Sequence, residues 1–186
     1  MAKPPKSLKG SLLLDGGNLA GSFFHRAVVL VCQHDSEGAF GLVLNQLSGT
    51  TAGQALPGEV PRGLVDLPLH VGGPVEPGAL SFLHADPLLP EGNVIPGIQL
   101  SHSLDSLFEL AGTESLTRRL RVFAGYAGWG AGQLDSEMRR KAWVTHAATP
   151  DLVFSEPAST LWRRIIAKKG WVYRLMAEGP DDLSTN

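Results

Sequence analysis

The sequence predicts a single domain of the α+β class, and two observations carry this prediction. The chain has 186 residues, of which 43% are hydrophobic, which is enough to build one core. Its first half alternates short apolar runs with turns rich in Gly and Pro, whereas its second half also carries apolar residues at helical spacing. Strands followed by a mixture of helices and strands indicate α+β rather than a regular βαβ alternation.

The first half is predicted to be rich in strands. The expected strands are 11–14, 27–33, 40–44, 69–71 and 79–84. Segment 27–33 is apolar on both faces, which favours a central strand, and Ser36-Glu37-Gly38 is the turn to the next strand. A three-residue loop over Glu76-Pro77-Gly78 would place His70 opposite His84 in a second hairpin. Residues 50–61 are expected to form a loop with one helical turn.

The second half is predicted to contain three helices. Segment 103–111 has apolar residues at i, i+3, i+4 and i+7, and Gly112 ends this helix. Gly170 is the corresponding stop for the last helix. The expected elements are helices 103–111, 133–141 and 155–169 and strands 120–124, 142–146 and 152–154.

The charges are distributed unevenly although the net charge is only −2. Residues 10–117 hold 2 basic and 11 acidic groups, whereas residues 118–174 hold 11 basic and 4 acidic groups. This pattern describes either solvated faces that pair within one fold or a cationic face for an anionic partner. The sequence favours the first interpretation, so direct DNA binding is not expected.

Cysteine usage and the apolar runs indicate a cytoplasmic protein. Cys32 is the only cysteine, so an internal disulfide and a cysteine-based zinc site are both excluded. The longest interior apolar run, 27–32, is too short for a bilayer, and the N-terminus lacks a secretory apolar segment. We therefore expect one domain over 1–186, flexible ends at 1–7 and 179–186, no membrane partner, no metal and no cofactor.

The densest candidate site is the glycine-rich stretch 125–133, expected to run from a strand into a helix. Its glycines, which include Gly128 and Gly130, permit positive φ and close approach to an anion, and the helix that follows offers free N–H groups. The alternative is a packing role beneath Tyr126 and Trp129. The spacing matches neither the dinucleotide nor the phosphate-loop motif.

Two further clusters offer weaker chemistry. Cys32 and His34 lie on the same face of a strand, where they form either a nucleophile–base pair, a redox centre or a buried structural pair. The expected pairing of His70 with His84 provides two metal ligands without an obvious third.

Four blocks in the chain carry a resemblance to a known family. They are 8–13, 32–45, 71–84 and 125–143, with the sequences LKGSLL, CQHDSEGAFGLVLN, VGGPV through LH, and GYAGWGAGQL through AW. Their order and spacing resemble those of the bacterial AlgH/YqgE family over most of residues 8–170.

The resemblance implies a fold and a set of candidate residues. It implies one α+β domain with a bifurcated or barrel-like, mostly antiparallel sheet, and an association with transcriptional regulation of exopolysaccharide production. The candidate site residues that it implies, without roles, are His34, Asn45, Gly72, Gly73, His84, Tyr126, Trp129, Gln133 and Glu137.

Three functional hypotheses follow. The first is a regulatory protein that binds a small ligand or a protein partner, in a pocket framed by the glycine-rich stretch and the Gly72-Gly73-Pro74 turn. The second is an enzyme that acts on a small anionic or phosphorylated metabolite, with His34 or Glu137 as acid or base. The third is a redox sensor at Cys32.

Overall fold

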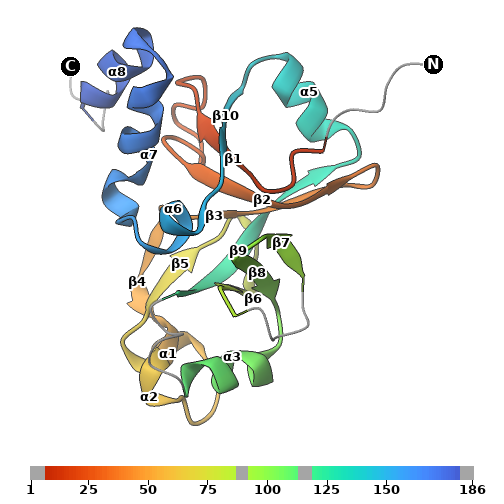
Figure 1. Ribbon diagram of the computed structural model, residues 1–186, viewed down its shortest axis with the longest axis vertical. Helices are drawn as coiled ribbons and strands as arrows, with labels where there is room; N and C mark the ends of the chain where they lie inside the picture. Colours follow the sequence, from red (N-terminus) through yellow and green to blue (C-terminus); the bar gives the residue numbers. More distant parts are fainter. Residues whose placement is uncertain (1–6, 87–91, 113–118, 181–186) are drawn as a thin grey trace.

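The computed structural model describes residues 7–86, 92–112 and 119–180 (Figure 1). The strands are β1 (Ser11–Asp15), β2 (Val28–Asp35), β3 (Gly38–Val43), β4 (Leu47–Thr51), β5 (Pro68–Val71), β6 (Val75–His84), β7 (Asn93–Ile95), β8 (Ile98–Ser101), β9 (Leu120–Gly130) and β10 (Trp143–Ala147). The helices are α1 (Ala52–Ala55), α2 (Arg62–Val65), α3 (Leu104–Ala111), α5 (Gln133–Arg139), α6 (Pro150–Phe154), α7 (Ala158–Ile166), the 3₁₀ turn η1 (Ala167–Lys169) and α8 (Trp171–Glu178).

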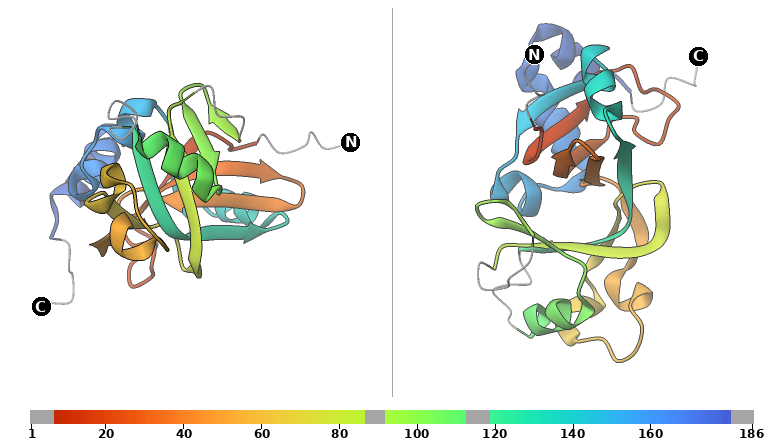
Figure 2. Two further views of the ribbon diagram at one scale, coloured as in Figure 1. Left: turned by 90° about the horizontal axis from the view of Figure 1, so that it is seen from below. Right: turned by 90° about the vertical axis from the view of Figure 1, so that its right-hand side faces the viewer.

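The strands form one curled, mostly antiparallel sheet. Eight of its ten strands follow the order β10-β1-β2-β3-β9-β6-β8-β7, while β5 pairs with β9 and β4 pairs with β5. Helices α1 to α3 lie at one end of the molecule, and α5, α7 and α8 lie at the other (Figures 1 and 2). The predicted α+β class and the bifurcated sheet are therefore confirmed.

Strand β9 belongs to both halves of the sheet. Residues 122–124 pair in parallel with β5, whereas residues 127–130 pair antiparallel with β3. Between these two stretches lies Gly125, whose φ of 69° falls in the left-handed region that favours glycine. The glycine-rich stretch is thus mainly strand, and the prediction that the strand ends at residue 124 was wrong.

Two glycines bring the backbones together at this change of partner. The Gly72 amide donates to Ala124 O (2.8 Å), and Gly72 O accepts from the Val43 amide (2.8 Å). A Cβ at Gly72 would overlap Gly125 O, and one at Gly73 would overlap the carbonyl carbon of Tyr126. These glycines serve the backbone crossing, and neither lines the cavity described below.

The two faces of β1, β2 and β3 bury different side chains. Leu12, Val28 and Leu30 pack with α7 and α8 on one face. Leu13 and Val29 face the other way, toward the cluster that contains the side chains of β9 and α5. Full burial of 28–32 confirms the predicted central strand, and the second face is where the candidate site forms.

Two local predictions are wrong. Residues 152–154 belong to α6 rather than to a strand, because Thr149 Oγ1 caps the helix by accepting from the Leu152 amide and Pro150 occupies its first turn. His70 and His84 do not face each other, because β9 lies between β5 and β6. Helix α8 was not predicted, and the expectation for the chain ends falls mostly outside the described residues.

Arg121 ties β9 to the end of α6. Its guanidinium donates to the carbonyl oxygens of Val153, Phe154 and Glu156. Its Nη1 also lies 3.1 Å from His70 Nε2, so this buried ring nitrogen acts as an acceptor and the imidazole is neutral. Burial, together with the Arg121 charge, lowers the pKa of His70 to about 4.

The depressed pKa predicts an acid-sensitive fold. Between pH 6.5 and about 4 the unfolded chain binds a proton at His70 and the folded chain does not. The stability from this group is therefore fully present above pH 6.5 and is lost as the pH falls toward 4. The loss is about 3 kcal/mol, at about 1.4 kcal/mol per pKa unit.

Urea unfolding between pH 4 and 7 measures this loss, with His70→Gln as the comparison because the amide oxygen can still accept from Arg121. The free energy of unfolding of the variant should fall by about 3 kcal/mol less than that of the natural chain over this range. If the free energy of unfolding fell equally with pH in both chains, His70 would be excluded as the source of the acid sensitivity.

Candidate functional site

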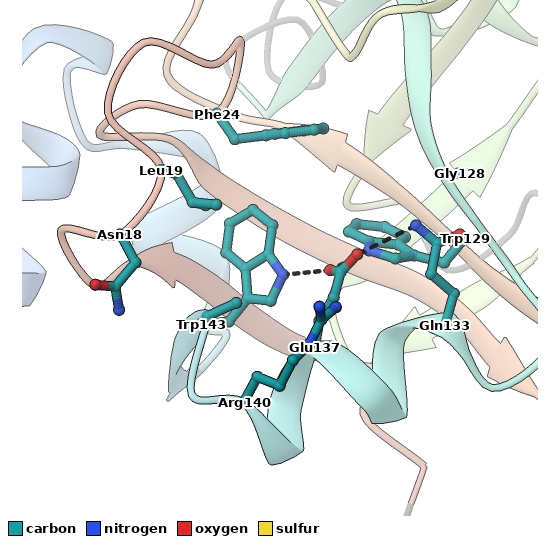
Figure 3. Close-up of a pocket in the computed structure, with 10 residues that line it drawn as sticks. Asn18, Leu19, Phe24, Gly128, Trp129, Gln133, Glu137, Arg140 and Trp143 are labelled. Atoms are coloured by element: carbon teal, nitrogen blue, oxygen red, sulfur yellow. Dashed lines mark hydrogen bonds between the residues drawn. The ribbon is translucent and has the colours of Figure 1, made fainter.

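A cavity of about 480 Å³ lies on the second face of the sheet, where β9, α5 and β10 meet the segment between β1 and β2 (Figure 3). Its size is in the range of small-molecule sites. Its lining residues are Asn18, Leu19, Phe24, Gly128, Trp129, Gln133, Glu137, Arg140, Ala142 and Trp143.

The carboxylate of Glu137 organises this cavity. Its Oε2 accepts from the indole N–H groups of Trp129 (2.9 Å) and Trp143 (2.8 Å). Its Oε1 accepts from Gln133 Nε2 (3.1 Å), while Gln133 Oε1 accepts from the Gly130 amide (3.1 Å). Three neutral donors from two strands and one helix therefore fix one carboxylate at the cavity wall (Figure 3).

The local sequence explains this convergence. Gln133 and Glu137 lie four residues apart and so project from the same side of α5. Gly132 begins the helix with a φ of 68°, which turns the chain sharply after β9. Trp143 opens β10, and its ring packs edge-on against Phe24 (centroids 5.6 Å apart) and Trp129 (6.3 Å). Aromatic packing thus holds the indole N–H groups in position.

The chain matches the AlgH-like family over residues 12–174. It belongs to this family. Its AlgH-like sequence is 37% identical over 179 residues to a UPF0301 protein of Chlorobium chlorochromatii, covering 95% of this chain and 94% of that protein. It is also 32% identical over 190 residues to a UPF0301 protein of Chlamydia caviae, with both chains covered completely (100%). The predicted family is therefore confirmed.

Solved structures show the same AlgH-like fold. The solution structure of the AlgH protein from Pseudomonas aeruginosa superposes with a TM-score of 0.76 at 27% identity, covering 97% of this chain and 98% of that one. A crystal structure of a protein from Corynebacterium diphtheriae gives 0.74 at 21% identity, covering 95% and 94%, which supports the fold alone.

The structure unites only part of the predicted site of this AlgH-like chain. Gly128, Trp129, Gln133 and Glu137 line the cavity, and Gly130 contributes its amide to Gln133. Tyr126 instead stacks on Phe40 with ring centroids 5.0 Å apart.

His34 lies elsewhere and has structural partners on both ring nitrogens. Its Nδ1 accepts from the Leu8 amide (2.9 Å), and its Nε2 lies 3.7 Å from Asp135 Oδ1. These contacts hold the segment before β1 and helix α5 to the end of β2. His34, for which an acid–base role was considered, does not line the cavity.

Asn45 and His84 likewise contact backbone. Asn45 Oδ1 accepts from the Val28 amide (2.8 Å), and Asn45 Nδ2 donates to Arg26 O (2.9 Å), so the side chain joins the start of β2 to the end of β3. The buried His84 accepts at Nδ1 from the Asp86 amide (3.2 Å). Neither residue lines the cavity.

Cys32 lies on β2 with its side chain buried in the core, and its Sγ lies 3.7 Å from Leu30 O. Burial raises the pKa of its thiol far above the ordinary value, so the thiolate that redox chemistry requires is suppressed. The redox hypothesis therefore has no support from the geometry of this residue.

Six cavity residues were not predicted as site residues: Asn18, Leu19, Phe24, Arg140, Ala142 and Trp143. Arg140 directly follows α5 and lies three residues after Glu137. This helical spacing could have indicated from the sequence that the two side chains are neighbours. Trp143 lies within 125–143, the fourth sequence block that carries the family resemblance. The side chains before β2 reach the cavity through tertiary packing, which local spacing does not reveal.

The described residues contain no group of three or more His, Cys, Asp or Glu side chains arranged to hold a metal ion. None of the helices in the described ranges has the length and apolar character needed to cross a bilayer.

The hydrogen bonds to Glu137 predict a measurable contribution to stability. Glu137→Ala removes the shared acceptor and leaves two largely buried indole N–H groups without it. Bonds to charged groups contribute about 1.5–3 kcal/mol each, and water in the cavity recovers part of this, so we expect a loss of about 3 kcal/mol. Urea unfolding measures the change.

Glu59→Ala is the matched control, because Glu59 is an exposed carboxylate in the loop before α2. Its free energy of unfolding should stay within about 0.5 kcal/mol of the natural chain. Equal effects of the two substitutions would contradict the organising role assigned to Glu137.

Proposed function

We propose that this AlgH-like chain is a cytoplasmic regulatory protein that acts by binding a small molecule, and that the Glu137 cavity is its binding site. The observation that carries the proposal is a carboxylate held by three neutral donors at the wall of an aromatic cavity. Binding sites commonly combine apolar walls with a few fixed polar groups. Fixing those groups before the ligand arrives lowers the entropy cost of binding.

The geometry supports this role better than anion capture by the glycine-rich stretch. In the sequence, that stretch suggested free backbone N–H groups. In the fold, residues 127–130 pair with β3 from Gly38 to Gly41, so this backbone takes part in the sheet. The cavity next to it is lined by side chains, and a carboxylate stands at its wall.

Any link to transcription is proposed to be indirect, through the ligand or a protein partner. Several arginines that made the second half basic are used within the fold. Arg121 and Arg163 donate to the ends of α6 and α8, and Arg164 pairs with Glu156 at 2.6 Å. Fewer cations therefore remain for DNA phosphates than the sequence suggests.

The alternative is an enzyme that acts on a small anionic metabolite in the same cavity. Glu137 favours it, because a carboxylate in a site is a candidate general base or acid. Its three hydrogen bonds favour binding over proton transfer, because they occupy most of its lone pairs and restrict its motion. Catalytic conversion of a bound compound would support the enzyme hypothesis over the binding role.

Thermal unfolding with a panel of nucleosides, nucleotides, amino acids and sugar phosphates tests the proposal. A compound present at about 100 times its dissociation constant stabilises the fold by about 2.7 kcal/mol, which raises the Tm by roughly 5–10 °C in a chain of this size. Leu19→Trp fills the cavity wall and should abolish the shift.

Leu47→Trp is the matched control, because Leu47 lies exposed on β4 and outside the cavity lining. It should preserve the shift. A shift that persists in Leu19→Trp would place the ligand elsewhere, and the absence of a shift with every compound would contradict the proposed function.

The indirect link predicts weak contact with DNA. Gel-shift titration with promoter DNA at physiological salt should show no saturable complex below about 1 μM, the upper limit of ordinary non-specific affinity. A tight, saturable complex would instead assign the chain a direct DNA-binding role.

A further inference from the structure

The hydrogen bonds of Glu137 leave one acceptor position for a ligand. A carboxylate offers about four lone-pair positions. Trp129 and Trp143 use two of them on Oε2, and Gln133 uses one on Oε1. The remaining position on Oε1 calls for an N–H or O–H donor, and the negative charge disfavours an anionic group at this end of the cavity.

The apolar part of the cavity suits a flat ring. Phe24 and Trp143 pack edge-on with ring centroids 5.6 Å apart, and Leu19 lies beside Trp143, so these three side chains line one apolar part of the cavity (Figure 3). Aromatic walls favour a second ring in stacked or edge-on contact. A ring that carries an N–H group can therefore contact these walls while it donates to Glu137.

Arg140 supplies the opposite charge at the same cavity. It follows Glu137 by three residues and lines the cavity from the end of α5. The ion pairs found among the described residues do not include its guanidinium. An exposed guanidinium binds carboxylate or phosphate through paired hydrogen bonds, so it can receive the anionic end of a ligand.

We propose that the ligand carries an N–H donor on or beside a flat ring and an anionic group at its other end. Glu137 Oε1 accepts from the donor, the aromatic wall contacts the ring, and Arg140 binds the anion. This inference rests on the proposed function. Two chemical sources share the pattern: a nucleotide whose base bears an amino group, and an aromatic amino acid.

Calorimetric titration separates these sources. The probes are guanosine monophosphate with guanosine as its uncharged counterpart, L-tryptophan with tryptamine as its counterpart, and inorganic phosphate. The nucleotide or the amino acid should bind, and loss of its phosphate or carboxylate group should weaken binding about tenfold. Binding of the nucleotide or of the amino acid identifies the source, and phosphate alone should not bind.

Arg140→Gln tests the anion contact, with Arg139→Gln as the matched control because it removes the same charge from the neighbouring exposed position on α5. Arg140→Gln should lower the affinity for the nucleotide or the amino acid that binds about tenfold and should not weaken the binding of its counterpart without the anionic group. Arg139→Gln should alter neither. If both substitutions weakened binding equally, the effect would reflect general electrostatic attraction rather than a contact with Arg140, and the inference would be overturned.

The remaining outcomes separate this inference from the proposed function. Equal affinity for a charged probe and its counterpart overturns the ligand class, while the function stands. The same conclusion follows if no ring compound binds but another compound gives a Tm shift that Leu19→Trp abolishes. Failure of all compounds in both experiments overturns the inference and the proposed function together.

Discussion

The fold depends on the close approach of two backbones where β5 ends and β9 changes its neighbour. Gly72 accepts a backbone bond from Val43 and donates one to Ala124, so a single residue joins the two halves of the sheet. Side chains at Gly72 or Gly73 would occupy the space of β9 itself. Because the crossing lets β9 leave β5 and pair with β3, it carries Trp129 to the face where α5 packs. The candidate site is a consequence of this crossing rather than an independent feature of a loop.

At the site, one carboxylate joins three elements. Glu137 on α5 connects to β9 through Trp129 and to β10 through Trp143, so the same bonds stabilise the fold and shape the cavity. Bonds to a charged acceptor are roughly twice as strong as neutral ones, which explains why polar atoms are tolerated within an aromatic cluster. The arrangement also restricts what the cavity can bind, because the lone pairs used by the protein are not available to a ligand.

Local patterns predicted most of the fold, and tertiary partners decided the rest. The continuous apolar run within 27–33 and the apolar spacing of 103–111 each depend on neighbouring residues, and both predictions were confirmed. The glycines of 125–130 looked like a loop because glycine weakens strands on average, whereas pairing with β3 overrides this preference. For the site, the resemblance supplied Trp129, Gln133 and Glu137. It also supplied His34 and Asn45, whose contacts are structural, because a shared sequence block does not separate packing from binding.

The part of the cavity wall that precedes β2 in the sequence is shaped by contacts that no local sequence pattern indicates. The buried Asp15 accepts from the amides of Gly17, Leu19 and Arg26, and these bonds shape the segment that brings Leu19 to the cavity. Arg26 lies over the Trp162 ring, 5.0 Å from its centroid, and donates to carbonyls at the end of α8. The C-terminal helix thus buttresses the segment whose other side lines the candidate site.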